Sequence, residues 1–182
     1  KNMVMFMDMK VMNVSEAIRK RYSVRSYQDR PVEEEKLQRV MEAARLAPSA
    51  NNKQEWRYVV VQDPQTRKKL SEIARGQRFV AEAPVVIAAC AVTDNHVMTC
   101  GQLCYPIDVA ISIDHLTLQA VEEGLGTCWI GAFFEDRAKE LLGIPETVRI
   151  IDLVTLGYPA DEWRPKNRLT LDQIVMKERW QD

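Results

Sequence analysis

The sequence of 182 residues lacks what several protein classes require. Its 4 cysteines form no CxxC pair, and a domain of this length needs no disulfide staples, so reduced thiols in a cytoplasmic protein are expected. The longest apolar stretches, such as residues 85–92, are too short to cross a bilayer. An excess charge of one sign is also missing, with 25 basic against 26 acidic residues, which argues against nucleic acid or membrane partners.

Familiar catalytic motifs are missing as well. The chain has no GxSxG, HExxH, Walker or GxGxxG motif. Its two histidines, His96 and His115, leave few candidates for acid–base catalysis, and His115 falls on a predicted core helix. If the protein is an enzyme, a bound cofactor is therefore expected to carry the difficult chemistry.

What the sequence does contain is typical of one globular domain. Hydrophobic residues make up 46% and charged residues 28%. Residues 1–12 hold five of the 8 methionines, and we interpret them as a poorly ordered leader or cloning remnant. Residues 13–182 are then expected to form the single domain.

Hydrophobic patterning predicts alternating helices and strands. Helices are expected over residues 14–22 (capped by Ser15), 32–47, 64–75, 103–123 and 135–142. Strands are expected over residues 57–62, 85–92, 128–130 and 148–156, of which 85–92 is apolar throughout and should be central. This alternation predicts a helix-flanked sheet. The polar tail from Ala160, which turns apolar over residues 169–176, is expected to embrace another subunit.

A row of potential metal ligands recurs every four residues: His96, Cys100, Cys104 and Asp108. They would share one face of a continuous helix. Residues 93–95 are turn-like, however, and Gly101 weakens a helix there. A lid loop with buried thiols is therefore favoured over a metal site.

Three polar clusters could hold a ligand. Residues 19–25 place four cations in seven positions, which suits a phosphate group or simply a solvated helix end. Residues 47–56 form a turn rich in amides and hydroxyls, which could also be an ordinary helix-to-strand loop. Residues 165–168 contain two cations and mean little alone.

Together with Gly-Leu-Gly-x-x-Trp-Ile-Gly at residues 124–131 and Leu-Gly-Tyr-Pro at 156–159, these clusters resemble the FMN-dependent nitroreductase family in its short, single-domain form. The resemblance spans residues 14–176. It implies an α+β fold, a three-layer α/β/α sandwich with a mixed, mainly antiparallel central sheet. It also implies a homodimer with exchanged C-terminal arms and two FMN molecules at the interface.

The resemblance implies FMN contacts at five places in the chain. Arg21, Tyr22 and Ser23 would lie near the phosphate and ribityl chain, and Arg25 near the N1/O2 edge of the ring. Lys166 and Arg168 would complete the phosphate grip. The remaining positions are Pro48, Ser49, Ala50 and Asn51 or Asn52, which would cover the ring from the facing subunit; Ile130 and Gly131, near N5; and Gln77 or Arg78, at the pyrimidine.

The activity implied by the resemblance is hydride transfer from NADH or NADPH through flavin N5 to nitroaromatic, quinone or similar acceptors, by a ping-pong mechanism. No side chain need act as a dedicated catalytic acid. The substrate is expected to meet His96, Met98, Cys100 and Tyr105. Two alternatives remain: a dehalogenase-like or flavin-fragmenting enzyme of the same fold, and a non-enzymatic FMN-binding or redox-sensing protein that uses Cys100 and Cys104.

Overall fold

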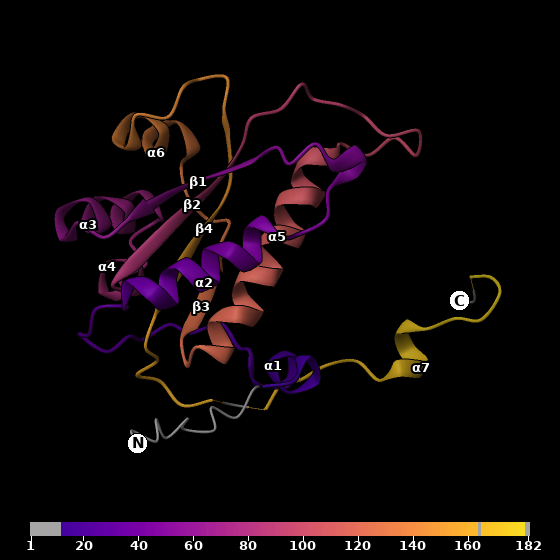
Figure 1. The fold of residues 1–182 in the computed structure, drawn as a ribbon, viewed down its shortest axis with the longest axis horizontal. Helices are drawn as coiled ribbons and strands as arrows, with labels where there is room; N and C mark the ends of the chain where they lie inside the picture. Colours follow the sequence, from indigo (N-terminus) through magenta and orange to yellow (C-terminus); the bar gives the residue numbers. More distant parts are fainter. Residues whose placement is uncertain (1–11, 164, 181–182) are drawn as a thin grey trace, which may run out of the picture.

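A four-stranded antiparallel sheet forms the middle layer of the computed structural model, which describes residues 12–163 and 165–180 (Figure 1). Its strands are β1 (Trp56–Val61), β2 (Val85–Ala91), β3 (Gly126–Ile130) and β4 (Arg149–Gly157), in the order β1-β2-β4-β3. Every residue of β2 is buried, which confirms the central strand expected from its apolar run. Residues 1–11 of the expected leader lie outside the described residues.

Helices cover both faces of the sheet. Helices α2 (Glu34–Arg45) and α5 (Cys104–Glu122) pack against one face and share a core with it. Helices α3 (Pro64–Ile73), α4 (Phe79–Glu82) and α6 (Glu135–Leu142) build the second core on the other face. This arrangement confirms the predicted three-layer sandwich.

Local sequence explains most helix boundaries. Helix α1 (Val14–Lys20) begins where the side chain of Asn13 accepts a hydrogen bond from the Glu16 amide at 2.9 Å. The expected cap at Ser15 is therefore wrong, because Asn13 already meets the free amide of the first turn. Helix α4 has only four residues and the 3-10 turn η1 (Ala50–Asn52) three, too few to show a periodic pattern.

Helix α5 contacts two other helices and the strands of the sheet. Pro106 lies in its first turn, where a missing amide costs no hydrogen bond. Its buried positions extend around much of the circumference, because it packs on α2, α1 and the sheet. Although it is the longest helix in the described chain, neither it nor any other described helix is long and apolar enough to span a membrane.

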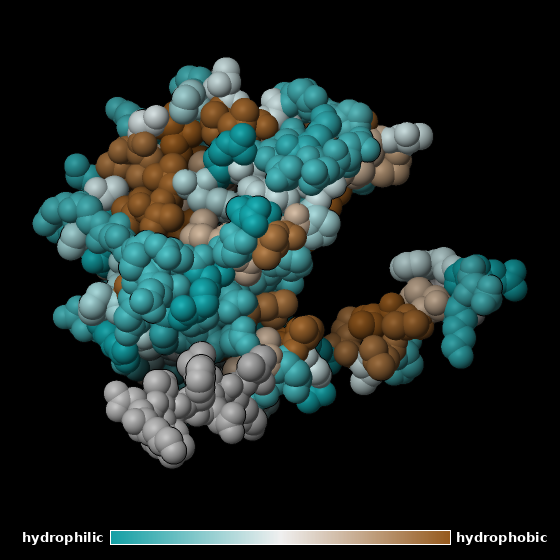
Figure 2. All heavy atoms as spheres, in the orientation of Figure 1, coloured by the Kyte–Doolittle hydropathy of each residue, from teal (hydrophilic) through white to brown (hydrophobic). Residues whose placement is uncertain are grey.

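The C-terminal arm leaves the body of the molecule (Figure 1). It carries the short helix α7 (Leu171–Ile174), which begins with a capping box between Thr170 and Gln173. Figure 2 shows hydrophobic residues gathered on this arm, and Leu171, Ile174 and Val175 are each more than half exposed. An arm this short cannot bury those side chains by itself. That it embraces a second subunit stays a prediction.

Candidate cofactor site

The segment after α1 and the start of the C-terminal arm meet in one polar cleft of about 510 Å³. Its lining residues come from the segment after α1 and from the start of the arm: Tyr22, Ser23, Arg25, Asp161, Glu162, Pro165, Lys166, Asn167 and Arg168. Five of them, Tyr22, Ser23, Arg25, Lys166 and Arg168, were expected from the sequence to share a site. The fold therefore brings together cations that lie some 140 positions apart.

The cleft concentrates positive charge. The pKa of Lys166 lies below its usual value because of burial and because Arg21 and Arg168 are close to it. Lys166 is held there by a hydrogen bond from its Nζ to the carbonyl oxygen of Ile18. Among the described residues, no ion pair involves Arg21, Arg25, Lys166 or Arg168. Such cations suit a dianionic phosphate, so these residues fit the phosphate end of FMN.

Asp161 organises one wall of the cleft and was not singled out by the sequence. Its carboxylate accepts hydrogen bonds from the Tyr22 hydroxyl at 3.2 Å and from the Arg25 amide at 3.0 Å. Burial and the neighbouring Asp161 raise the pKa of Tyr22 to about 12, so the phenol stays a hydrogen-bond donor. No local sequence signal could have identified this carboxylate, because its partners are 136 to 139 residues away.

The segment after α1 lies along the outer edge of β3. Ser23 forms a parallel bridge with Thr127, and the Val24 amide donates to the Thr127 carbonyl at 2.9 Å. This bridge adds the parallel pairing expected of a mixed sheet. A Cβ on Gly126 would lie 2.3 Å from Cγ2 of Val24, so the second glycine of the Gly-Leu-Gly motif permits this close approach.

Further along the same edge, the predicted ring contacts also lie together. Gly131 is exposed, and a Cβ added to it would meet nothing within 4 Å. The side-chain amide of Gln77 donates hydrogen bonds to the carbonyls of Ala74 at 2.9 Å and of Ala132 at 3.5 Å. These bonds place Gln77 against the loop that follows Gly131. Arg78 is exposed at the start of α4. The geometry therefore favours Gln77 over Arg78 as the neighbour of Gly131.

Ile130 is the last residue of β3, and a buried carboxylate accepts a hydrogen bond from its amide. Its amide donates to Oδ1 of Asp152 at 2.9 Å, and Oδ2 of Asp152 is buried without a hydrogen-bond partner in the described structure. Burial raises the pKa of Asp152 to about 7. No feature of the sequence pattern singles out Asp152, which occupies a strand position that patterning assigns to the core.

The turn at residues 48–54 has an unusual backbone. Asn51, Asn52 and Gln54 have φ values of 51°, 54° and 51°, a region that asparagine tolerates better than most residues. The turn is held by hydrogen bonds from the Ala50 amide to both oxygens of Asp108, at 3.2 and 3.1 Å. Asp108, part of the suspected metal row, thus has a structural role. Pro48 and Ser49 lead into the turn, and Pro48 is exposed.

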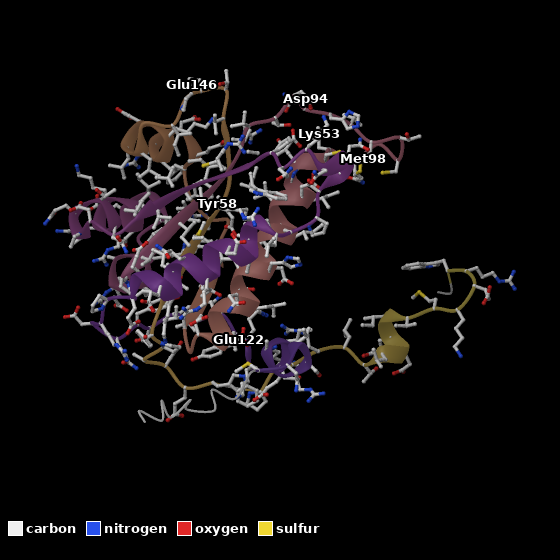
Figure 3. The ribbon with its side chains drawn as sticks, in the orientation of Figure 1. Lys53, Tyr58, Asp94, Met98, Glu122 and Glu146 are labelled. Carbon is white, nitrogen blue, oxygen red and sulfur yellow. The ribbon has the colours of Figure 1, made fainter. Side chains whose placement is uncertain are left out.

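This turn and the cationic cleft lie at opposite ends of α5. Asp108 is in the second turn of the helix and Glu122 is its last residue, a separation of about 21 Å at 1.5 Å per residue. Figure 3 shows Lys53, which lies in the turn, beside Asp94 and Met98 at one end of the molecule and Glu122 near α1 at the other. One chain therefore does not bring the predicted covering turn to its own cation cluster.

The loop between β2 and α5 carries three of the four expected substrate contacts. It folds back on itself through a hydrogen bond from the Met98 amide to the Gln102 carbonyl at 2.8 Å, and its His96 and Cys100 are exposed. The fourth, Tyr105, is 5% exposed within the core, and its hydroxyl accepts a hydrogen bond from Arg149 at 3.3 Å.

The potential metal ligands His96, Cys100, Cys104 and Asp108 are divided between this loop and α5. Helix α5 starts at Cys104, so the four side chains do not share a helical face. The described residues contain no group of three or more His, Cys, Asp or Glu side chains that could hold a metal. The expected burial of both thiols is right for Cys104 and wrong for Cys100, because Cys100 occupies the tip of the loop.

Comparisons with known proteins agree with this geometry. A sequence model described as the nitroreductase family matches residues 18–103 and 74–158. A putative NADH dehydrogenase/NAD(P)H nitroreductase of Archaeoglobus fulgidus is 35% identical over 88% of this chain and 94% of its own length. An FMN reductase [NAD(P)H] of Bacillus subtilis is 35% identical over 86% of this chain and 70% of its own. The crystal structure of a nitroreductase family protein from Clostridium difficile superposes with a TM-score of 0.82 at 35% identity, covering 93% of this chain and all of that one.

Proposed function

The chain belongs to the nitroreductase family, and we propose that it transfers electrons from NAD(P)H to nitroaromatic, quinone or similar acceptors by a ping-pong mechanism. It is an NAD(P)H-dependent flavin oxidoreductase with FMN as its cofactor, as the matching FMN reductase and nitroreductase relatives indicate. The observation that carries this proposal is that three cations, Arg25, Lys166 and Arg168, line one cleft, with Arg21 close to Lys166.

Different side chains of the protein would bind different parts of the cofactor. Arg21, Lys166 and Arg168 would bind the phosphate, because their charges have no carboxylate partner among the described residues. Ser23 would donate a hydrogen bond beside the ribityl chain, and the Tyr22 oxygen, whose proton is directed at Asp161, would accept one there. When bound, FMN supplies the hydride chemistry that the side chains lack.

The ring would lie along the edge of β3. Gly131 leaves open space there, and Gln77 lies beside the following loop. Arg25 would place a positive charge at the N1/O2 edge, where it favours negative charge gained on reduction. No protein side chain is then needed as a proton donor in hydride transfer.

A homodimer would complete the site. The 48–52 turn, with Asn51 and Asn52 at its tip, lies too far along α5 to cover the flavin bound by its own chain, so we assign this role to the turn of a second copy. The exposed apolar residues of the arm support the same assembly. The four free cysteines are in keeping with a reducing compartment such as the cytoplasm.

The loop with His96, Met98 and Cys100 would face the acceptor. His96 and Cys100 are exposed on it, so an acceptor could reach them. The alternative of a thiol redox sensor is weakened because burial and the nearby Asp108 raise the pKa of Cys104, which keeps the thiol protonated and slow to oxidise.

Initial-rate kinetics test the proposed mechanism. The rate is measured while NADH or NADPH and a quinone or nitroaromatic acceptor are varied together. Ping-pong transfer predicts parallel double-reciprocal lines, because the oxidised nicotinamide leaves before the acceptor binds. Intersecting lines would contradict it. Reaction of halogenated aromatics or breakdown of FMN itself, without turnover of quinones, would favour the alternative enzymes of the same fold.

A further inference from the structure

Asp152 on β4 has a role that the cofactor cleft itself does not explain. It is 4% exposed, and its Oδ1 accepts the Ile130 amide at 2.9 Å. Its Oδ2 is buried without a hydrogen-bond partner in the described structure. A buried carboxylate oxygen without a partner is costly, so a structural role alone would be served better by an uncharged side chain.

The position of Asp152 links this carboxylate to the cofactor site. Ile130 is the last residue of β3, and Gly131 follows it directly. Asp152 also lies where the pairing between β2 and β4 is irregular, since Ala89 pairs with Asp152 and Cys90 with Ile150. At this point β4 has one more residue than β2. This β-bulge turns the Asp152 side chain toward the end of β3, which the regular alternation of side chains along a strand would not do.

Among the described residues, no cation forms an ion pair with Asp152. On β3 the titratable neighbour is Cys128, whose own pKa is raised by burial, so it stays an uncharged thiol near neutral pH. On β2 the nearest thiol is Cys90, with a pKa raised to about 11. On α6, Lys139 pairs with Glu135 at 3.3 Å.

On α5 and at the start of β4, Tyr105 and Arg149 interact with each other, and Arg149 also pairs with Glu135 at 2.9 Å. Within the part of the chain that the structure describes, the charge of Asp152 is therefore balanced by the backbone amides of Ile130 and Leu153. Burial outweighs these amides and raises the pKa of Asp152 to about 7, within the range in which an enzyme works.

We propose that Asp152 is a positioning residue for the flavin-facing end of β3: its charged form holds the Ile130–Gly131 segment through the Ile130 amide, and loss of that charge loosens the segment and weakens FMN binding. The physical reason is that an ionised acceptor forms a shorter and stronger hydrogen bond to an amide than a neutral one. The inference rests on the proposed function, because it places the flavin ring beside Gly131.

The hydrogen bond is tested first without FMN. The amide resonance of Ile130 is followed by NMR in the apoprotein from about pH 5 to about pH 9. We expect it to shift with a midpoint near 7, the pKa of Asp152, and to be flat in Asp152→Asn. Asp108→Asn is the matched control, since Asp108 is also 4% exposed but binds a different amide. An Ile130 resonance that does not titrate in the wild type, or titrates equally in Asp152→Asn, overturns the proposal.

The link to the cofactor is tested by fluorescence titration with FMN. Between about pH 6 and pH 8.5, the wild-type Kd is expected to fall about fivefold more than that of Asp152→Asn, a modest coupling between sites. Ionisation of the FMN phosphate affects both proteins equally and cancels in this ratio. An equal pH dependence in the two proteins overturns the proposal. If neither protein binds FMN, the proposed function fails, while the NMR titration still decides whether Asp152 controls Ile130.

Discussion

The backbone amide of Arg25 donates a 3.0 Å hydrogen bond to Oδ2 of Asp161, which joins the segment after α1 to the first residues of the C-terminal arm. The Tyr22 hydroxyl reinforces the joint through the other carboxylate oxygen. Lys166, a few residues later, reaches back to the carbonyl oxygen of Ile18. The cationic cleft is thus assembled by contacts between the region around the end of α1 and the start of the C-terminal arm.

The phosphate grip is tested by removing charge from both ends. Arg21→Ala combined with Arg168→Ala is expected to weaken FMN binding about 100-fold, if each guanidinium contributes about 1.5 kcal/mol as a charge-assisted donor. Lys68→Ala with Lys69→Ala, two exposed cations on α3, is the control and should leave the Kd unchanged. Normal FMN occupancy in the first double variant would mean that the phosphate lies elsewhere.

Asp161 and Glu162 line the same cleft but should differ in effect. Asp161→Ala removes the acceptor for Arg25 and Tyr22 and is expected to weaken FMN binding about fivefold, the equivalent of about 1 kcal/mol. Glu162→Ala removes a negative charge from the cleft without removing a hydrogen bond seen in the structure. Titration with FMN should therefore show no weakening in Glu162→Ala. Similar losses in both variants would argue against the positioning role of Asp161.

Alanine substitutions at two glycines of the Gly-Leu-Gly-x-x-Trp-Ile-Gly motif should differ in effect, one lowering stability and the other lowering FMN affinity. Gly126→Ala places a methyl group 2.3 Å from Cγ2 of Val24 and is expected to lower the free energy of unfolding by about 1–3 kcal/mol. Gly131→Ala meets open space, so its stability in urea should match the wild type while its FMN affinity falls. Wild-type FMN affinity in Gly131→Ala would place the ring away from β3.

Acid sensitivity should depend on Glu33 and Tyr158. The pKa of Glu33 is lowered to about 2, first by the hydrogen bond from the Tyr158 hydroxyl, at 2.6 Å, and further by Arg30. A lowered pKa in the folded state means stability that is present above pH 4.5, the ordinary value, and is lost as the pH falls toward 2. Urea unfolding at several pH values should show a smaller loss over this window in Tyr158→Phe. An identical pH profile would show that the bond does not bias folding.

The sequence predicts the framework of this protein because the framework follows local rules. The unbroken apolar run of β2 predicts a central strand, and the periodic pattern of α6 predicts its bounds, Glu135–Leu142. The cap of α1 was misassigned because Asn13 and Ser15 both suit that position and sequence alone does not choose between them. The cations of the cleft were predicted from motifs that resemble those of the nitroreductase family.

Residues whose partners are distant in the chain could not be found in this way. Asp161 acts on Tyr22 and Arg25 across more than 130 residues, and Asp152 acts on Ile130 across 22. Neither carboxylate differs locally from an ordinary polar residue of a tail or strand. Their roles depend on strand register and on how the arm docks, which are set by packing across the whole domain.

Anaerobic titration of the purified protein with NADH and with NADPH tests the central claim most directly. The account predicts a yellow protein whose flavin absorbance is lost on adding one of the two nicotinamides and returns on adding a quinone or nitroaromatic acceptor. A colourless protein that takes up no FMN would contradict it, and so would bound flavin that dithionite reduces but neither nicotinamide does.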